Sequence, residues 1–168
     1  SRRFHRDFIN LGFGGSARGE TGMAEYLAAL PMSLFALDYD YNAPTEEHLA
    51  ETHERMYRTV RAAHPDIPII MMSRPKVLLN DAEKKRAEII RNTWETARNS
   101  GDSNVYFIPG AELMQDCGDE GLIDRCHPTD LGFSSIARTL GNRLAVQICP
   151  CKTEICVVEY SQHGNMML

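Results

Sequence analysis

Residues 34–72 read LFALDYDYNAPTEEHLAETHERMYRTVRAAHPDIPIIMM. Two short apolar runs, 34–37 and 67–72, enclose a segment in which apolar residues recur at helical spacing over 45–63. Thr45 is a suitable N-cap for that helix, because it follows Pro44 and precedes two glutamates. The stretch therefore predicts a strand, a helix and a second strand, which is the unit that builds parallel sheets.

The same alternation continues on both sides of this unit. We expect further strands at 8–11 and 104–108, and helices at 21–29 and 81–99. A last helix has its apolar positions between Phe133 and Ile148. We therefore predict one three-layer α/β/α domain with a mostly parallel sheet over residues 1–148. Residues 149–168 follow the last predicted helix and differ from the rest in their sequence pattern. We expect a tail or an extra edge strand there.

The bulk composition is that of an ordinary globular protein. The chain has 168 residues, 43% of them hydrophobic and 24% charged, which suits one domain with a proper core. Its net charge of −5 opposes nonspecific binding to nucleic acid. No apolar run reaches membrane-spanning length and no secretory signal opens the chain, so we expect no membrane partner. Cytoplasmic and secreted or periplasmic locations both stay open, as does the oligomeric state.

A carboxylate and a histidine stand three residues apart in the segment 124–128, which reads DRCHP. In a loop that enters a helix, Asp124 could accept from one ring nitrogen of His127 and fix its tautomer. The other ring nitrogen would then be free to act as a base. The plain alternative is that His127 only caps or packs the start of the helix.

Two other segments end apolar runs in small or polar residues. They are 9–17, INLGFGGSA, and 37–44, LDYDYNAP. Together with the Asp124 motif they resemble, in order, the sequence blocks of the SGNH (GDSL-type) serine hydrolase family. The resemblance implies a flavodoxin-like fold, oxyanion-hole donors at Gly15 and Asn42, and a catalytic acid and base at Asp124 and His127. It implies no metal and no organic cofactor.

The serine block of that family lies upstream of the glycine block. We therefore expect the first strand to be missing from residues 1–148, as in an N-terminally truncated domain, and the nucleophile is unknown. Ser161 follows the apolar run 155–158, and it becomes a candidate if the chain is circularly permuted. Ser16 nearly completes a G-x-S-x-G motif, but the resemblance places it beside the oxyanion hole instead.

The resemblance implies hydrolysis of a small-acyl, acetyl-type carboxylic ester, with a small molecule such as an acetylated carbohydrate as the partner. Two alternatives stay open. Residues 12–17 match G-x-G-x-x-A, with Asp38 about 20 residues after the end of the motif, as in a dinucleotide-binding Rossmann-like domain. The third possibility is a noncatalytic relic that binds esters without turnover.

The remaining cysteines and histidines give weaker predictions. Cys117 and Cys126 flank the loop of Asp124, where a disulfide and two free thiols are equally open. Zinc is not expected, because the cysteines near the C-terminus have no histidines at ligand spacing. Arg74, after the third strand, orients a substrate or forms an ion pair. We expect surface or helix-face positions for five histidines: His5, His48, His53, His64 and His163.

Overall fold

The structure is a computed structural model that describes residues 7–144 and 156–161. The strands are β1 (Asp7–Asn10), β2 (Leu34–Asp38), β3 (Ile69–Met72), β4 (Val105–Ile108) and β5 (Cys156–Ser161). The helices are α1 (Thr21–Ala29), α2 (Glu46–Ala63), α3 (Asp81–Asn99), α4 (Gly110–Leu113) and α5 (Asp130–Arg143). Two short 3₁₀ turns, η1 (Asp40–Asn42) and η2 (Gly118–Gly121), follow β2 and α4.

The strands form a single sheet in the order β1-β5-β2-β3-β4, and neighbouring strands pair in parallel. This is the flavodoxin-like order 2-1-3-4-5, in which β1 takes the place of the second strand. The place of the first strand is taken by β5, whose Ser161 pairs in register with Asp38. The predicted three-layer α/β fold is confirmed. The expectation of an edge strand after residue 149 is wrong, because β5 lies inside the sheet.

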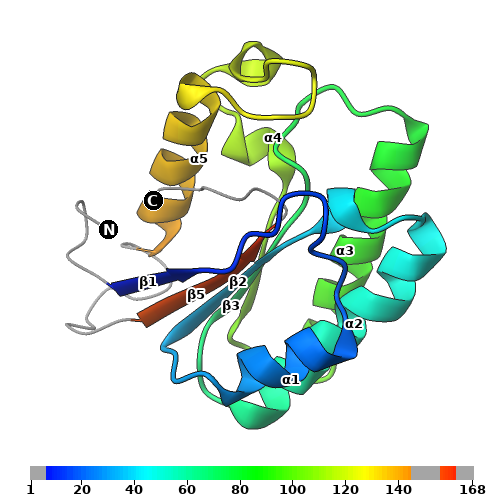
Figure 1. Ribbon diagram of the computed structural model, residues 1–168, viewed down its shortest axis with the longest axis vertical. Coiled ribbons are helices and arrows are strands. Elements are labelled where there is room, and N and C mark those ends of the chain that lie inside the picture. Colours follow the sequence, from blue (N-terminus) through cyan, green and yellow to red (C-terminus); the bar gives the residue numbers. More distant parts are fainter. Residues whose placement is uncertain (1–6, 145–155, 162–168) are drawn as a thin grey trace.

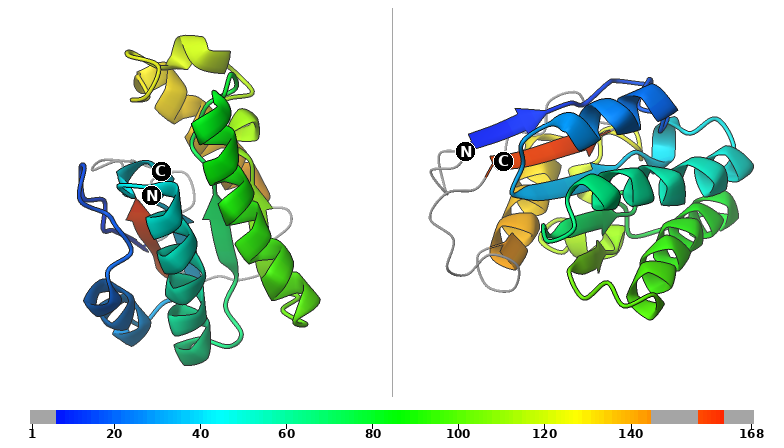
Figure 2. Two further views of the ribbon diagram at one scale, coloured as in Figure 1. Left: turned by 90° about the vertical axis from the view of Figure 1, so that its right-hand side faces the viewer. Right: turned by 90° about the horizontal axis from the view of Figure 1, so that it is seen from below.

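Helices cover both faces of the sheet (Figures 1 and 2). In β2, Phe35 and Leu37 belong to the apolar cluster that contains residues of α1, α2 and α3. Leu34 and Ala36 belong to a second cluster with residues of α4 and α5. Successive strand residues point to opposite faces, so a strand buried on both sides has to be apolar throughout. This explains the uninterrupted apolar runs in the sequence.

Side-chain caps fix where the long helices begin. Thr45 accepts from the backbone N–H of His48 at 3.1 Å and starts α2, as predicted. Asn80 and Glu83 form a reciprocal capping box at the start of α3. These two helices begin just after the carboxyl ends of β2 and β3 and therefore hold the loops there in place. None of the helices in the described residues is long and apolar enough to cross a membrane.

His53 on α2 is buried, which corrects the expected surface or helix-face position. Its side chain is 1% exposed and stacks on Tyr39, with ring centroids 5.7 Å apart. Neither ring nitrogen has a hydrogen-bond partner among the described residues. Burial lowers the pKa of His53 from 6.5 to about 3, because a charged imidazole would lose its hydration there.

We expect His53 to make the domain acid-sensitive. Between pH 6.5 and about 3, His53 is protonated in the unfolded chain but neutral in the folded protein. The free energy of unfolding therefore rises with pH in this range. At pH 5 this one residue lowers the free energy of unfolding by about 2 kcal/mol relative to pH 8. Urea unfolding at pH 5 and pH 8 measures this difference. The decrease in the free energy of unfolding from pH 8 to pH 5 should be about 2 kcal/mol smaller for His53→Phe than for wild type. Equal losses in the two proteins would contradict this assignment.

Candidate active site

The loop between η2 and α5 is closed by short-range bonds around Asp124. Leu122 and Pro128 form an antiparallel bridge, and the N–H of Ile123 donates to the carbonyl of His127 at 3.0 Å. Asp124 Oδ1 accepts from the backbone N–H groups of Cys126 at 3.0 Å and His127 at 2.8 Å. The carboxylate of Asp124 therefore stabilises the backbone of the loop.

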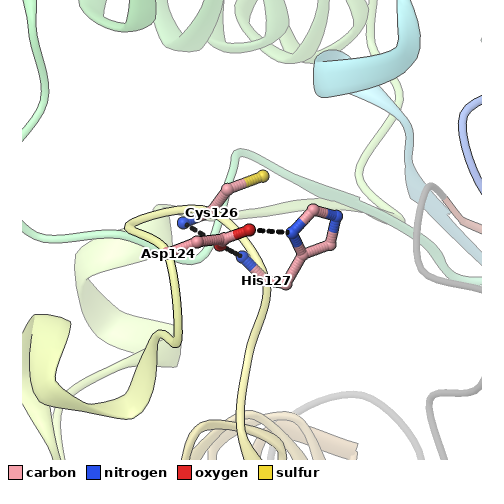
Figure 3. Close-up of side chains that lie close together, drawn as sticks. All are labelled: Asp124, Cys126 and His127. Atoms are coloured by element: carbon pink, nitrogen blue, oxygen red, sulfur yellow. Dashed lines mark hydrogen bonds and ion pairs between the residues drawn. The ribbon is translucent and has the colours of Figure 1, made fainter.

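Asp124 and His127 form the hydrogen-bonded pair that their spacing predicts (Figure 3). Asp124 Oδ2 lies 2.7 Å from His127 Nδ1, and because a carboxylate only accepts, Nδ1 donates. Nε2 lies on the far side of the ring and has no partner among the described residues. The backbone and ring N–H groups of His127 lower the pKa of Asp124 to about 2, so the carboxylate stays ionised.

Close packing supports this loop, which contains a residue with an unfavourable backbone conformation. Arg125, between the two residues, has φ 64°, a conformation that non-glycine residues rarely adopt outside functional sites. At the start of α5, a Cβ on Gly132 would lie 2.3 Å from the carbonyl oxygen of Gly121. Thr129 donates its N–H to the same carbonyl at 2.8 Å. Only a glycine at 132 permits this approach, which anchors the loop to η2.

The loop after β1 presents Gly15 in a tight turn. The N–H groups of Ser16 and Ala17 both donate to the carbonyl of Phe13, at 2.9 and 3.2 Å. Gly15 itself has φ +70°, in the left-handed region that favours glycine. Its own N–H donates to no acceptor within the ranges 7–144 and 156–161. A free backbone donor is what an oxyanion hole requires.

Asn42 lies in η1, directly after β2, and reaches across to the Gly15 loop. Its Nδ2 donates to the carbonyl of Phe13 at 3.0 Å, which leaves the second amide hydrogen for another acceptor. Gly15 and Asn42 both line one open cavity of about 510 Å³. The structure thus brings the two predicted oxyanion-hole residues together from loops 27 residues apart in the sequence.

Tyr41 connects these loops to the loop of His127, a contact that the sequence analysis did not predict. A hydrogen bond with the Cys126 side chain, together with partial burial, raises the pKa of Tyr41. Tyr41 directly precedes Asn42, and Cys126 directly precedes His127. The sequence left open whether Cys117 and Cys126 form a disulfide or are two free thiols. In the structure both are free thiols.

Asp124, Cys126 and His127 also form a group of potential metal ligands, with one ligand atom from each within 4.8 Å of the others. In the observed geometry the N–H of His127 Nδ1 donates a hydrogen bond to Asp124 Oδ2. A metal bound to these two atoms would have to displace that proton. We therefore expect that incubation with EDTA leaves ester hydrolysis by the full-length protein unchanged. A loss of rate with EDTA that added Zn²⁺ restores would contradict this reading.

Three serines lie at or after the carboxyl ends of strands and can be compared as candidate nucleophiles. Ser161 ends β5 at the carboxyl edge of the sheet, between β1 and β2, the strands that lead to Gly15 and Asn42. Ser16 is exposed in the Gly15 turn and makes no described bond to His127. Ser73, after β3, is buried and accepts from the N–H of Gly110 at 2.9 Å. Position in the sheet favours Ser161 among them.

The glycine-rich turn and Asp38 do not have the arrangement of a dinucleotide-binding site. In that site the glycine-rich turn runs straight into a helix whose first N–H groups bind the pyrophosphate. Here α1 begins at Thr21, four residues beyond Ala17. Asp38, which would have to reach a ribose, is 2% exposed. The geometry of both parts therefore disfavours nucleotide binding.

Comparison with known proteins supports an acylhydrolase. The sequence profile described as the GDSL-like Lipase/Acylhydrolase family matches residues 1–145. A solved GDSL-like lipase from Bacteroides ovatus is 30% identical, with TM-score 0.71, and the match covers 82% of this chain and 42% of that one. No protein in a search of curated sequences matches.

Two more distant structures show the same fold. A salicylyl-acyltransferase from a tetracycline biosynthetic pathway is 19% identical with TM-score 0.67, covering 81% of this chain and 44% of its own. An active-site mutant of a family two carbohydrate esterase from Clostridium thermocellum is 15% identical with TM-score 0.61, covering 82% and 46%. The chain thus spans less than half the length of the solved structures it matches. With 145 of its 168 residues matched, the chain belongs to the GDSL-like lipase/acylhydrolase family of hydrolases.

Proposed function

We propose that the full-length protein hydrolyses carboxylic esters with a small acyl group, using His127 as base and Asp124 as its orienting acid. The observation that carries the proposal is the 2.7 Å bond between Asp124 Oδ2 and His127 Nδ1, which leaves Nε2 open to a nucleophile. Family membership supports acyl hydrolysis as the reaction class.

In this mechanism a serine hydroxyl attacks the ester carbonyl while Nε2 of His127 takes the hydroxyl proton. Asp124 stabilises the imidazolium that results. The N–H of Gly15 and the amide of Asn42 donate to the oxyanion, which is where such donors lower a barrier most. The imidazolium then gives its proton to the departing alcohol as the C–O bond breaks. Water, deprotonated by His127, releases the acid from the acyl-enzyme.

Within the chain we propose Ser161 as the nucleophile. Its support is the place of β5 between β1 and β2, which puts the end of the strand between the loops of Gly15 and Asn42. A parallel α/β sheet places reacting groups at such carboxyl ends. If another serine of the full-length protein reacts, the roles of the other four residues are unchanged.

We propose an acetylated carbohydrate as the substrate class. A family two carbohydrate esterase with this fold was solved in complex with cellohexaose, at 15% identity and TM-score 0.59. The exposed position of His127, whose side chain is 66% accessible, suits an alcohol as bulky as a sugar on the base side of the site.

The test is release of acetate from acetylated xylan and from a small aryl acetate by the purified full-length protein. Hydrolysis of both, lost in the His127→Ala variant, is the expected result. Binding of the aryl acetate without release of acetate would instead favour the noncatalytic alternative. Activity that persists in His127→Ala would remove the pair from the mechanism.

A further inference from the structure

The cavity beside Gly15 and Asn42 has a charged wall that acetyl hydrolysis does not use. Its volume is about 510 Å³, far more than a methyl group fills. Four further residues of its lining form this charged wall: Tyr41, Arg74, Glu83 and Arg86. These residues come from η1, the loop after β3, and the first turns of α3.

Arg74 and Glu83 form the buried part of this wall. The guanidinium carbon of Arg74 lies 3.5 Å from the centroid of the Tyr41 ring, and its Nη1 donates to Glu83 Oε1. Lys76 Nζ donates to the two Glu83 oxygens at 2.8 and 3.1 Å. The single negative charge of Glu83 is therefore shared between two cations, which leaves positive charge in excess.

Arg86 is the second cation of the same wall, after Arg74. Its Nη1 donates to the backbone carbonyl of Asp40, and it has no ion pair among the described residues. The Asp40 carboxyl is 1% exposed, and burial raises its pKa in spite of the nearby arginines. Among the residues that line the cavity, Arg74 and Arg86 are cations and Glu83 alone is an acid. Glu47, outside the lining, also interacts electrostatically with Arg86. The cavity is therefore positive, and the half-buried Arg86 has donors to spare.

The position of the cavity relative to the base identifies the part of the ester that it holds. Gly15 and Asn42 line the cavity, whereas Asp124 and His127 do not. The leaving alcohol takes its proton from His127 and so departs on the side of the base. The group that stays with the oxyanion donors is the acyl group.

We propose that this cavity binds a short acyl chain that ends in a carboxylate, with Arg86 as its principal ligand. The proposal rests on the proposed ester hydrolysis and deepens it, since it adds the acyl part of a dicarboxylic acid to the acetyl group as an acyl group that the site accepts. An arginine binds a carboxylate through two parallel N–H donors, which fixes the chain length as well as the charge.

The first test compares monoethyl succinate with ethyl butyrate, which lacks the terminal carboxylate. We expect the full-length protein to hydrolyse monoethyl succinate with kcat/KM about tenfold higher, the gain typical of one charge-assisted hydrogen bond. Arg86→Gln should bring the ratio of the two kcat/KM values down to about one, while Arg86→Lys should keep part of the preference. Equal rates on the two esters in wild type would overturn the proposal.

A matched control is Arg91→Gln, because Arg91 lies on the same helix but faces the Phe107 ring, 5.0 Å from its centroid. This variant should keep the preference for monoethyl succinate. If Arg91→Gln and Arg86→Gln lose it equally, the effect is one of general charge and the role of Arg86 is refuted.

Binding of free succinate separates this proposal from the proposed function. Calorimetry should show succinate binding to wild type about tenfold more tightly than acetate, and Arg86→Gln should abolish the difference. If no ester is hydrolysed but this binding is found, the proposed ester hydrolysis fails and the proposed anion-binding cavity stands. If esters are hydrolysed but succinate binds no better than acetate, the cavity proposal alone fails.

Discussion

Replacing His127 with alanine in the full-length protein is expected to lower kcat for ester hydrolysis on the order of 10,000-fold or more. The reason is that Nε2 is the only proposed group that moves the proton from nucleophile to leaving alcohol. Substrate binding should change little, because the exposed ring lies outside the cavity that Gly15 and Asn42 line. Steady-state kinetics on an aryl acetate would give kcat and KM separately.

The matched control for this variant is His64→Gln. His64 follows α2 at the opposite edge of the sheet, where its Nε2 lies 3.0 Å from the carbonyl of Ala28. We expect this change to leave kcat as it is. If His127→Ala keeps more than a tenth of wild-type kcat, His127 is not the base and the D-x-x-H segment has only a structural role.

Asn42→Ala is expected to lower kcat by about 100- to 1,000-fold, which corresponds to about 3–4 kcal/mol in the barrier. The amide hydrogen that is not bonded to Phe13 is the one proposed to meet the oxyanion. That charge exists only as the carbonyl is attacked, so the loss should fall on kcat and leave KM nearly unchanged.

Two further variants test whether the amide donor of Asn42 is needed. Asn92→Ala, at an exposed position on α3, should be silent. Asn42→Asp keeps the size of the side chain but replaces the donor with an acceptor, so it should be as slow as Asn42→Ala. An active Asn42→Asp would mean that the amide donor is not needed and would remove Asn42 from the oxyanion hole.

The sequence predicted most regular elements because they carry strong local signals. Helix α3 was predicted to the residue, since the capping side chain of Asn80 and Gly101 mark its two ends. The short α4 was not predicted, because four residues show no periodicity. An apolar run such as that of β5 predicts a strand but carries no information on which neighbours it pairs with. Its place inside the sheet therefore needed the structure.

The candidate site was predictable where chemistry follows from spacing along the chain. Asp124 and His127 are three residues apart, and their bond follows from that spacing. The proximity of Gly15 to Asn42 followed from the alternation of strands and helices, which places both residues beyond the carboxyl ends of parallel strands, and from the family's block order. His53 could have been found, because it lies four residues after Leu49 on the buried stripe of α2. The stacking of Arg74 on Tyr41 depends on two loops meeting in space, and no local pattern predicts it.

Labelling with a fluorophosphonate probe shows whether His127 activates a serine. The probe reacts only with an activated hydroxyl, and peptide mapping identifies the labelled residue. We expect one labelled serine in the folded wild-type protein and no label in His127→Ala, with Ser161 as the labelled residue in this chain. A folded wild-type protein that takes no label, or a label that His127→Ala does not reduce, would contradict it.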